Sequence, residues 1–151
     1  MQVNQVTVDL VRRVVKKKGS ILLPAHGKSM FPFIRQGDIC HFDACDPKTY
    51  KRGDIVLFTV GTNRLIAHRF MKRIHKDNQT YYLFKGDTNL LFDEPITQEQ
   101  ILGKMTAIER KKKKVDLKNI RNNLWSLLII NLPMMSKLLR KFIYRKGDFQ
   151  Y

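Results

Sequence analysis

The sequence predicts a mainly β fold: a small, coiled, barrel-like sheet with a short helix at the N-terminal end and a basic helix at the C-terminal end. Six short segments rich in β-forming residues lie between polar turns in the middle of the chain, a spacing typical of small barrels and coiled sheets. At both ends, apolar residues recur at helical spacing among lysines and arginines. The 151 residues, 43% of them hydrophobic, are enough for one compact core.

Residues 1–18 form a basic amphipathic segment. Within it, residues 6–18 are expected to be helical, because valines and leucines recur every three or four positions and Gly19 is a natural stop. The remaining face carries arginines and lysines. Two interpretations are open: the helix packs on the domain with a solvated basic face, or that face contacts a membrane surface.

Residues 19–110 form the central domain and hold the expected strands. The clearest strand is 53–60, which opens on a Gly-Asp turn and is rich in β-forming residues. Residues 61–63 then form a hairpin turn, and residues 65–74 pair back. The other strands are expected at 20–25, 39–42, 81–84 and 101–109.

The returning strand at 65–74 places a histidine on an apolar face. Successive side chains of a strand point to opposite faces, so Ile66, His68 and Phe70 share one face. His68 is therefore expected among apolar side chains and not in bulk solvent.

Residues 111–151 form a basic, partly apolar tail, entered through the charge run at 110–114. Residues 117–144 are expected to be helical, with a kink or break at Pro133. A basic amphipathic helix with one tryptophan fits a membrane surface or a groove in a partner protein. The alternative is an ordinary helix that covers the open end of the sheet.

No segment is expected to cross a membrane. The longest apolar stretch, residues 124–135, contains polar residues and a proline, and a spanning helix needs about 20 apolar residues. The N-terminal residues lack the pattern of a signal peptide. The expected location is cytoplasmic or peripheral to a membrane.

The charge favours anionic partners. Lysine and arginine number 29 against 13 aspartates and glutamates, a formal net charge of +16. Such a balance fits an anionic membrane surface, acidic peptides or nucleic acid. The two cysteines, Cys40 and Cys45, form no CxxC pair, so neither a zinc site nor another metal or cofactor is expected. Whether the two pair with each other, and the oligomeric state, stay open.

Ser29, His68 and a later aspartate supply the residue types of a serine hydrolase. A serine hydroxyl needs a base to take its proton. Histidine titrates near neutral pH, and a carboxylate behind it fixes its tautomer. Several aspartates follow His68 in the chain. Because unrelated folds carry such residues in different orders, the order alone does not settle the assignment.

Several ordered motifs together resemble the signal peptidase I-like (S24/S26) superfamily, which includes LexA-type self-cleaving repressors. Residues 27–32 followed by Gly37-Asp38 resemble its serine box. His68-Arg69 stands where bacterial signal peptidases carry Lys-Arg, as in the endoplasmic-reticulum (Ser-His) subgroup. The remaining matches are the strand box at 53–58, the later box at 85–89 and Gly103-Lys104. The similarity covers about residues 20–110 and implies a peptidase domain with the coiled β fold of that superfamily.

The resemblance also implies roles. Ser29 would be the nucleophile and His68 the general base, with Asp93 preferred by spacing over Asp87 as the third residue. The neighbouring family aspartate is replaced by Phe92. The backbone N–H of Ser29 would hold the oxyanion. Many relatives carry a hydroxyl two positions earlier, where this chain has Gly27, so the second donor, from Lys28, His26 or another N–H, stays open.

The implied activity is that of a serine endopeptidase that cleaves a signal or leader peptide after small residues through an acyl-enzyme. Its partner would be a peptide or preprotein. One alternative is a LexA-like self-cleaving, DNA-binding regulator. Only 28 residues precede Ser29, too few for a helix-turn-helix domain and a hinge, so nucleic acid is not expected. Another is a non-catalytic basic binding module.

Overall fold

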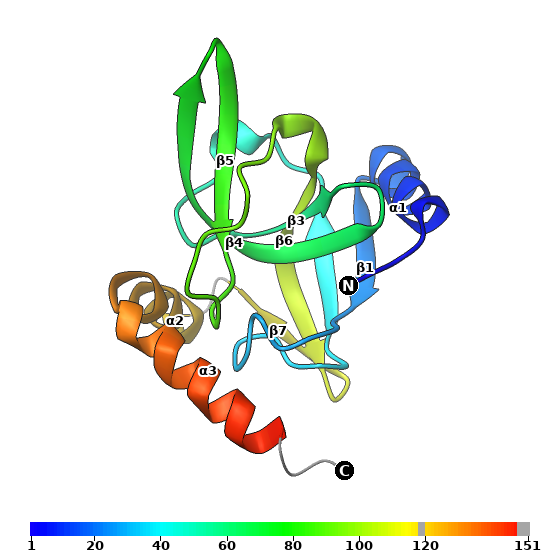
Figure 1. Ribbon diagram of the computed structural model, residues 1–151. Coiled ribbons are helices and arrows are strands. Elements are labelled where there is room, and N and C mark those ends of the chain that lie inside the picture. Colours follow the sequence, from blue (N-terminus) through cyan, green and yellow to red (C-terminus); the bar gives the residue numbers. More distant parts are fainter. Residues whose placement is uncertain (118–119, 148–151) are drawn as a thin grey trace.

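An antiparallel sheet of seven strands forms the centre of the computed structural model, which describes residues 1–117 and 120–147. The strand order is β1-β2-β6-β3-β4-β5, and β7 pairs with β6. The sheet coils without closing into a barrel (Figure 1). The prediction of a mainly β, barrel-like sheet with terminal helices is confirmed. The strands are β1 (Ser20–Pro24), β2 (Ile39–Asp43), β3 (Ile55–Val60), β4 (Arg64–Lys76), β5 (Gln79–Lys85), β6 (Ile101–Arg110) and β7 (Lys113–Asp116).

Strand β7 is an addition to the predicted strands. Lys111 and Lys112 have φ values of 50° and 62°, and two successive positive φ values match the right-handed twist of a tight hairpin. The chain reverses there, and Val115 pairs with Ile108 of β6. The sheet therefore continues beyond Arg110 into the lysine run.

Helix α1 (Gln5–Lys18) packs on the sheet through its valines. Val8, Val11 and Val15 are buried and join a core cluster with Leu57 and Leu65 of the sheet. Asn4 caps the first turn by accepting a hydrogen bond from the Thr7 N–H. Gly19, at φ 73°, ends the helix in the left-handed conformation as predicted. The apolar face of this helix is thus a packing face.

The predicted alternation along β4 is confirmed. Ile66 and Phe70 contribute to a second core cluster, which also contains Phe58 and Phe84, whereas Leu65 and Ala67 belong to the first cluster. His68 lies on the side of Ile66 and Phe70, with its ring edge-on to Phe58 at 6.3 Å between centroids. His68 is only 5% exposed, so the surrounding core residues hold its side chain in place.

The helical tail is divided at Pro133, as predicted. Helix α2 (Ile120–Asn131) ends just before Leu132, and α3 (Pro133–Gly147) begins after it. The two helices lie below the sheet in Figure 1, close to the loop that follows β5. Ser126 and Ile130 of α2 approach Gly53 at the start of the β3 segment. Among the described helices, none is long and apolar enough to cross a membrane.

The two cysteines do not pair. Both Cys40 in β2 and Cys45 are free thiols. Cys40 is 3% exposed, and burial raises the pKa of its thiol to about 12. Its role is that of a small apolar core residue.

Candidate active site

Ser29 lies in the loop between β1 and β2, and an ion pair closes that loop. Asp38, at the end of the loop, accepts hydrogen bonds from Arg110 Nε at 2.8 Å and from the Arg35 N–H at 2.8 Å. Arg110 also donates to the carbonyl of Phe33 at 2.9 Å. Burial alone would raise the pKa of Asp38, but these hydrogen bonds and charges outweigh it and hold the pKa below its usual value. The serine loop is therefore anchored to β6.

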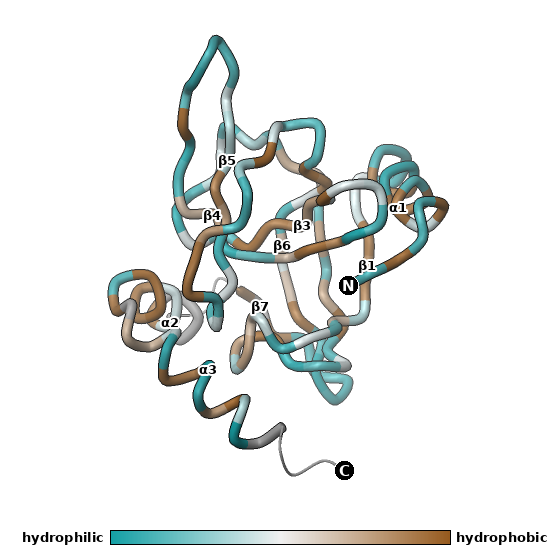
Figure 2. The backbone as a smooth tube through the Cα atoms, in the orientation of Figure 1, coloured by the Kyte–Doolittle hydropathy of each residue, from teal (hydrophilic) through white to brown (hydrophobic). Residues whose placement is uncertain are grey.

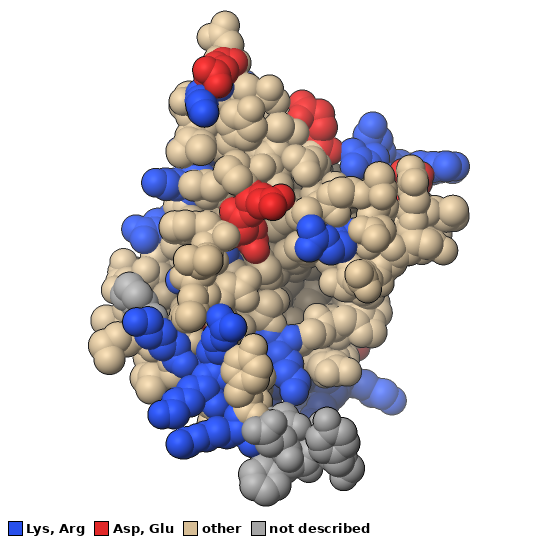
Figure 3. All heavy atoms as spheres, viewed as in Figure 1, with Lys and Arg blue, Asp and Glu red and all other residues tan. Residues whose placement is uncertain are grey.

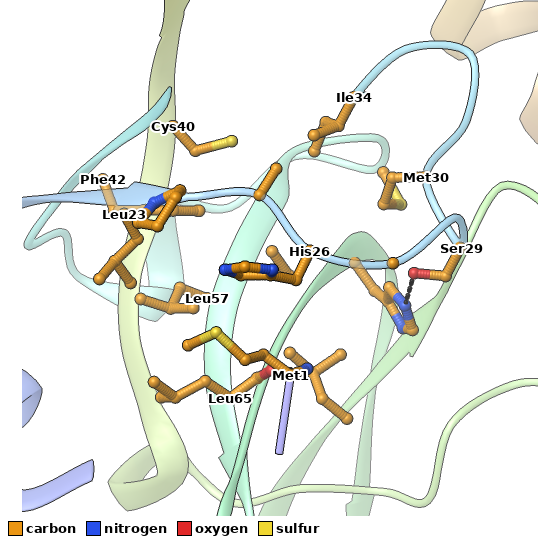
Figure 4. A pocket seen from close by; sticks show the side chains of 16 residues that line it. Met1, Leu23, His26, Ser29, Met30, Ile34, Cys40, Phe42, Leu57 and Leu65 are labelled. Carbon is orange, nitrogen blue, oxygen red and sulfur yellow. Dashed lines mark hydrogen bonds between the residues drawn. The ribbon is translucent and has the colours of Figure 1, made fainter. Parts of the chain in front are cut away.

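His68 reaches this loop from β4. It pairs with Val56 of the neighbouring strand, which fixes its position along the sheet. Its Nε2 lies 2.9 Å from the Ser29 hydroxyl oxygen (Figure 4). The structure thus brings together a serine and a histidine that are 39 residues apart in the chain.

Asp93 meets the other side of the same imidazole. Its Oδ2 lies 2.6 Å from Nδ1 of His68, and its own N–H donates to the carbonyl of Phe84 at 2.9 Å. An ionised carboxylate only accepts hydrogen bonds, so Nδ1 carries the proton. In the neutral imidazole Nε2 is then left to accept from the Ser29 hydroxyl. The two bonds form one chain from serine to histidine to aspartate.

Asp87, the second candidate carboxylate, is engaged elsewhere. It is 2% exposed and accepts from Arg69 Nε at 2.6 Å and Arg69 Nη2 at 3.1 Å. It also accepts from Trp125 Nε1 of α2 at 3.0 Å. Arg69 in turn donates to Ser126 at 2.7 Å. Asp87 therefore links Arg69, the neighbour of His68 on β4, to Trp125 of the helical tail. It is not part of the hydrogen-bonded chain from Ser29 through His68 to Asp93.

Two neighbours of Asp87 support the serine, and sequence reasoning did not assign them a role. The Thr88 N–H donates to the Ser29 carbonyl at 3.0 Å, and its hydroxyl donates to the same oxygen at 3.3 Å. Gly86 is so close that a Cβ there would lie 3.0 Å from both His68 Nε2 and the Ser29 carbonyl oxygen. The box at 85–89 thus fixes the backbone of Ser29.

The backbone N–H of Ser29 is the oxyanion donor that the sequence predicts. In the part of the chain that the structure describes, no group accepts a hydrogen bond from it. Gly27, beside it, has φ 84°, a conformation that glycine adopts without strain. A residue with a side-chain hydroxyl at position 27 would therefore be strained in this backbone conformation.

A largely apolar cavity of about 260 Å³ opens beside Ser29 and His68. Figure 4 shows His26, an exposed residue of the loop between β1 and β2, pointing into it. Met1 also lines it and pairs with β4: its N-terminal ammonium donates to the Leu65 carbonyl at 2.9 Å and its carbonyl accepts from the Leu65 N–H at 3.1 Å. No local sequence pattern signals this long-range pairing.

These features define a class of protein: a coiled β domain with a serine and a histidine in hydrogen-bond contact beside a cleft. The family model of the Peptidase S24-like proteins matches residues 1–106. The chain belongs to this family. It includes signal-peptidase-like proteases and LexA-like self-cleaving regulators as well as non-catalytic members. A search of curated proteins gave no match.

Proposed function

We propose that the protein is a serine endopeptidase of the signal peptidase I-like, Ser-His type, with Ser29 as nucleophile and His68 as general base. The observation that carries the proposal is the pair of hydrogen bonds, 2.9 Å from Ser29 to His68 and 2.6 Å from His68 to Asp93. Nucleophile, base and orienting carboxylate stand in hydrogen-bond reach of one another, which is the arrangement that activates a serine.

The reaction would follow from this geometry. His68 Nε2 takes the proton of Ser29 as the hydroxyl oxygen attacks the peptide carbonyl carbon. The Ser29 N–H donates to the oxyanion, and Asp93 stabilises the imidazolium. His68 then gives the proton to the leaving amine, and an acyl-enzyme remains. Water, deprotonated by His68, hydrolyses the ester and frees Ser29.

The proposed substrate is a signal or leader peptide cut after small residues. A cavity of about 260 Å³ has room for small side chains beside the serine. Leu65 exchanges two backbone hydrogen bonds with the Met1 segment, so an extended substrate would pair with this part of β4 as an added strand by taking the place of that segment. Backbone pairing of this kind suits a peptide recognised by its extended shape and small side chains.

The test is cleavage of a fluorogenic peptide with an Ala-X-Ala segment by the purified protein. Ser29→Ala and His68→Ala should each abolish measurable turnover, a loss on the order of 10³-fold or more. Ser20→Ala and His75→Ala, at exposed positions in β1 and β4, serve as matched controls and should cleave at the wild-type rate. Equal cleavage by all five proteins would refute the assignment.

The same proteins separate the proposal from its two alternatives. Incubation of the pure protein at raised pH, followed by electrophoresis, would reveal a Ser29-dependent self-cut if the chain were a LexA-like regulator without activity on added peptide. A non-catalytic module would neither cleave nor label at Ser29 with an acylating probe. The proposal predicts Ser29 labelling that the His68→Ala change suppresses.

A further inference from the structure

The outer face of α2 is apolar although it is exposed. Leu124, Leu127 and Leu128 are 56%, 58% and 39% exposed, while Ile129 on the opposite side is buried at 6%. Figure 2 shows the helix as hydrophobic along most of its length. Exposed leucines gathered on one face of a helix mark a site of contact with an apolar environment or partner.

Helix α3 continues the exposed apolar surface. Met134, Leu138 and Phe142 follow one another at intervals of four residues, which places them along one side of the helix, and they are 71%, 58% and 48% exposed. The Phe142 ring also stacks on Phe31, at 6.1 Å between centroids, so this end of the stripe adjoins the serine loop. Ser136, on the inner side, is 1% exposed. The helix is therefore docked by one side and offers an apolar stripe on the other.

Basic side chains run beside this stripe. Lys137, Lys141 and Arg145 also follow one another at intervals of four residues and are exposed. They therefore form a second row along α3, next to the apolar stripe. In the sequence from 120 to 147 there is no aspartate or glutamate, against Arg121, Lys137, Arg140, Lys141, Arg145 and Lys146. Figure 3 shows lysines and arginines gathered over the lower part of the molecule, where α2 and α3 lie, and the acidic residues above it.

The exposed apolar residues and the basic side chains beside them together favour an anionic lipid surface as the partner. Apolar stripes flanked by lysine and arginine are suited to the boundary between lipid headgroups and acyl chains, where the long basic side chains reach the headgroups. The missing acidic residues remove the repulsion that an anionic headgroup would meet. A nucleic acid would use the charge but not the leucines.

The surface borders the candidate active site. Leu91 and Phe92, 80% and 52% exposed, immediately precede Asp93. The same loop begins at Thr88 and Asn89, which line a hollow with Ser29 and with Arg140 and Tyr144 of α3. A flat anionic surface in contact with α3 would therefore lie next to the serine.

We propose that the outer face of α2 and α3 binds an anionic lipid surface, with both helices lying in the interfacial plane of that surface. This face consists of a set of exposed apolar residues and a row of basic ones: Leu124, Leu127, Leu128, Met134, Leu138 and Phe142, with Lys137, Lys141 and Arg145. This proposal does not rest on the peptidase activity. It assigns a function to the helical tail, which lies outside the region that the family model matches.

The experiment is co-sedimentation of the full chain with vesicles of phosphatidylcholine alone or with about 30% phosphatidylglycerol. The wild type should bind the vesicles that contain phosphatidylglycerol at least about tenfold more tightly than the vesicles of phosphatidylcholine alone. Leu127→Gln/Leu138→Gln should weaken that binding more than tenfold, whereas Leu10→Gln/Leu22→Gln, at exposed leucines of α1 and β1, should not. Likewise Lys137→Glu/Lys141→Glu should weaken it, and Lys72→Glu/Lys76→Glu, at exposed positions of β4, much less.

Circular dichroism and thermal unfolding of every variant would establish that it folds, and all the substituted positions are exposed. Equal binding to neutral and anionic vesicles, or no binding, would overturn the proposal. So would a stable oligomer in lipid-free buffer that Leu127→Gln/Leu138→Gln dissociates, because the apolar face would then be a protein interface. Binding and peptide cleavage are measured separately, so failure of one leaves the other judged on its own result.

Discussion

Asp93 and His68 are 25 residues apart in the chain, yet Oδ2 of the aspartate lies 2.6 Å from Nδ1 of the histidine. The bond fixes the tautomer in which Nε2 faces Ser29 as an acceptor. Asp87, six residues earlier, has its two carboxylate oxygens in the buried pair with Arg69. Two aspartates that the sequence left as alternatives thus have separate structural partners, and substitutions should separate them in function.

Asp93→Asn should abolish catalysis without unfolding the protein. An amide in place of the carboxylate favours the wrong imidazole tautomer and no longer stabilises the imidazolium, so kcat should fall by about 10⁴-fold. The measurement is the rate of peptide cleavage, together with a urea unfolding curve. Glu94→Gln, at the adjacent position, is the matched control and should keep the wild-type kcat. A kcat for Asp93→Asn within tenfold of wild type would contradict the role of Asp93.

Asp87→Asn should act mainly on stability. The substitution leaves the Arg69 guanidinium, which is 2% exposed, without a counter-charge, and breaking such a buried pair costs about 3–5 kcal/mol. Urea unfolding should show this loss in the free energy of unfolding. Asp54→Asn is the control, since its partner Lys104 lies 3.3 Å away in a partly exposed pair, worth about 1 kcal/mol or less. Equal losses in the two variants would contradict the assignment of Asp87 as a structural residue.

The contrast shows how far sequence reasoning reaches. The strand at 65–74 and the buried face of His68 were predictable because alternation is a local pattern. The choice between Asp93 and Asp87 was not, because it depends on the path of the loop after β5, which the Asp93 N–H bond to Phe84 fixes. Spacing within the resembling family preferred Asp93. The structure brings its carboxylate to His68, and its catalytic role stays a prediction.

Long-range pairing and turn conformation explain what was missed. Strand β7 follows a turn at Lys111 and Lys112 with positive φ, and lysine gives none of the signals that Asn-Gly or Gly-Gly would. Met1 lines the cavity because it pairs with Leu65, 64 residues away, and nothing in either segment alone predicts that contact. The basic run at 110–114 likewise indicates a boundary because of its charge, whereas it forms the hairpin between β6 and β7.

Acid should weaken the anchor of the serine loop. The pKa of Asp38 in the folded protein is lowered below its unfolded value: burial raises it, but the hydrogen bonds and charges of Arg110 and Arg35 together outweigh burial. The ionised carboxylate therefore contributes stability above the unfolded pKa, near about 4, and this contribution is lost as pH falls through the folded pKa. The free energy of unfolding of wild type should thus exceed that of Asp38→Asn at pH 7, and the gap should narrow towards pH 3.

Urea unfolding at pH 7, 5 and 3 measures that gap. Asp77→Asn, in the exposed turn between β4 and β5, is the control, and its difference from wild type should stay small at each pH. A gap for Asp38→Asn that is constant across this range would show that the ion pair with Arg110 does not couple stability to pH.

Gly86→Ala should lower the catalytic rate far more than it lowers stability. The new methyl carbon would lie 3.0 Å from His68 Nε2, from the Ser29 carbonyl oxygen and from Asn89 Cγ, so the imidazole or the serine loop has to shift by a few tenths of an ångström. A misplacement of about 1 Å at reacting atoms costs about 10²-fold in rate, so this smaller shift should lower kcat by a smaller factor. The glycine has no positive φ, so backbone strain adds nothing and the loss is steric. Peptide cleavage measured as kcat and KM would show a lower kcat with KM little changed. The control is Gly61→Ala, in a turn at φ 59° with open space around it, which should lose some stability through backbone strain but keep the wild-type kcat. An unaltered kcat in Gly86→Ala would mean that His68 does not work from the position in which it touches Ser29.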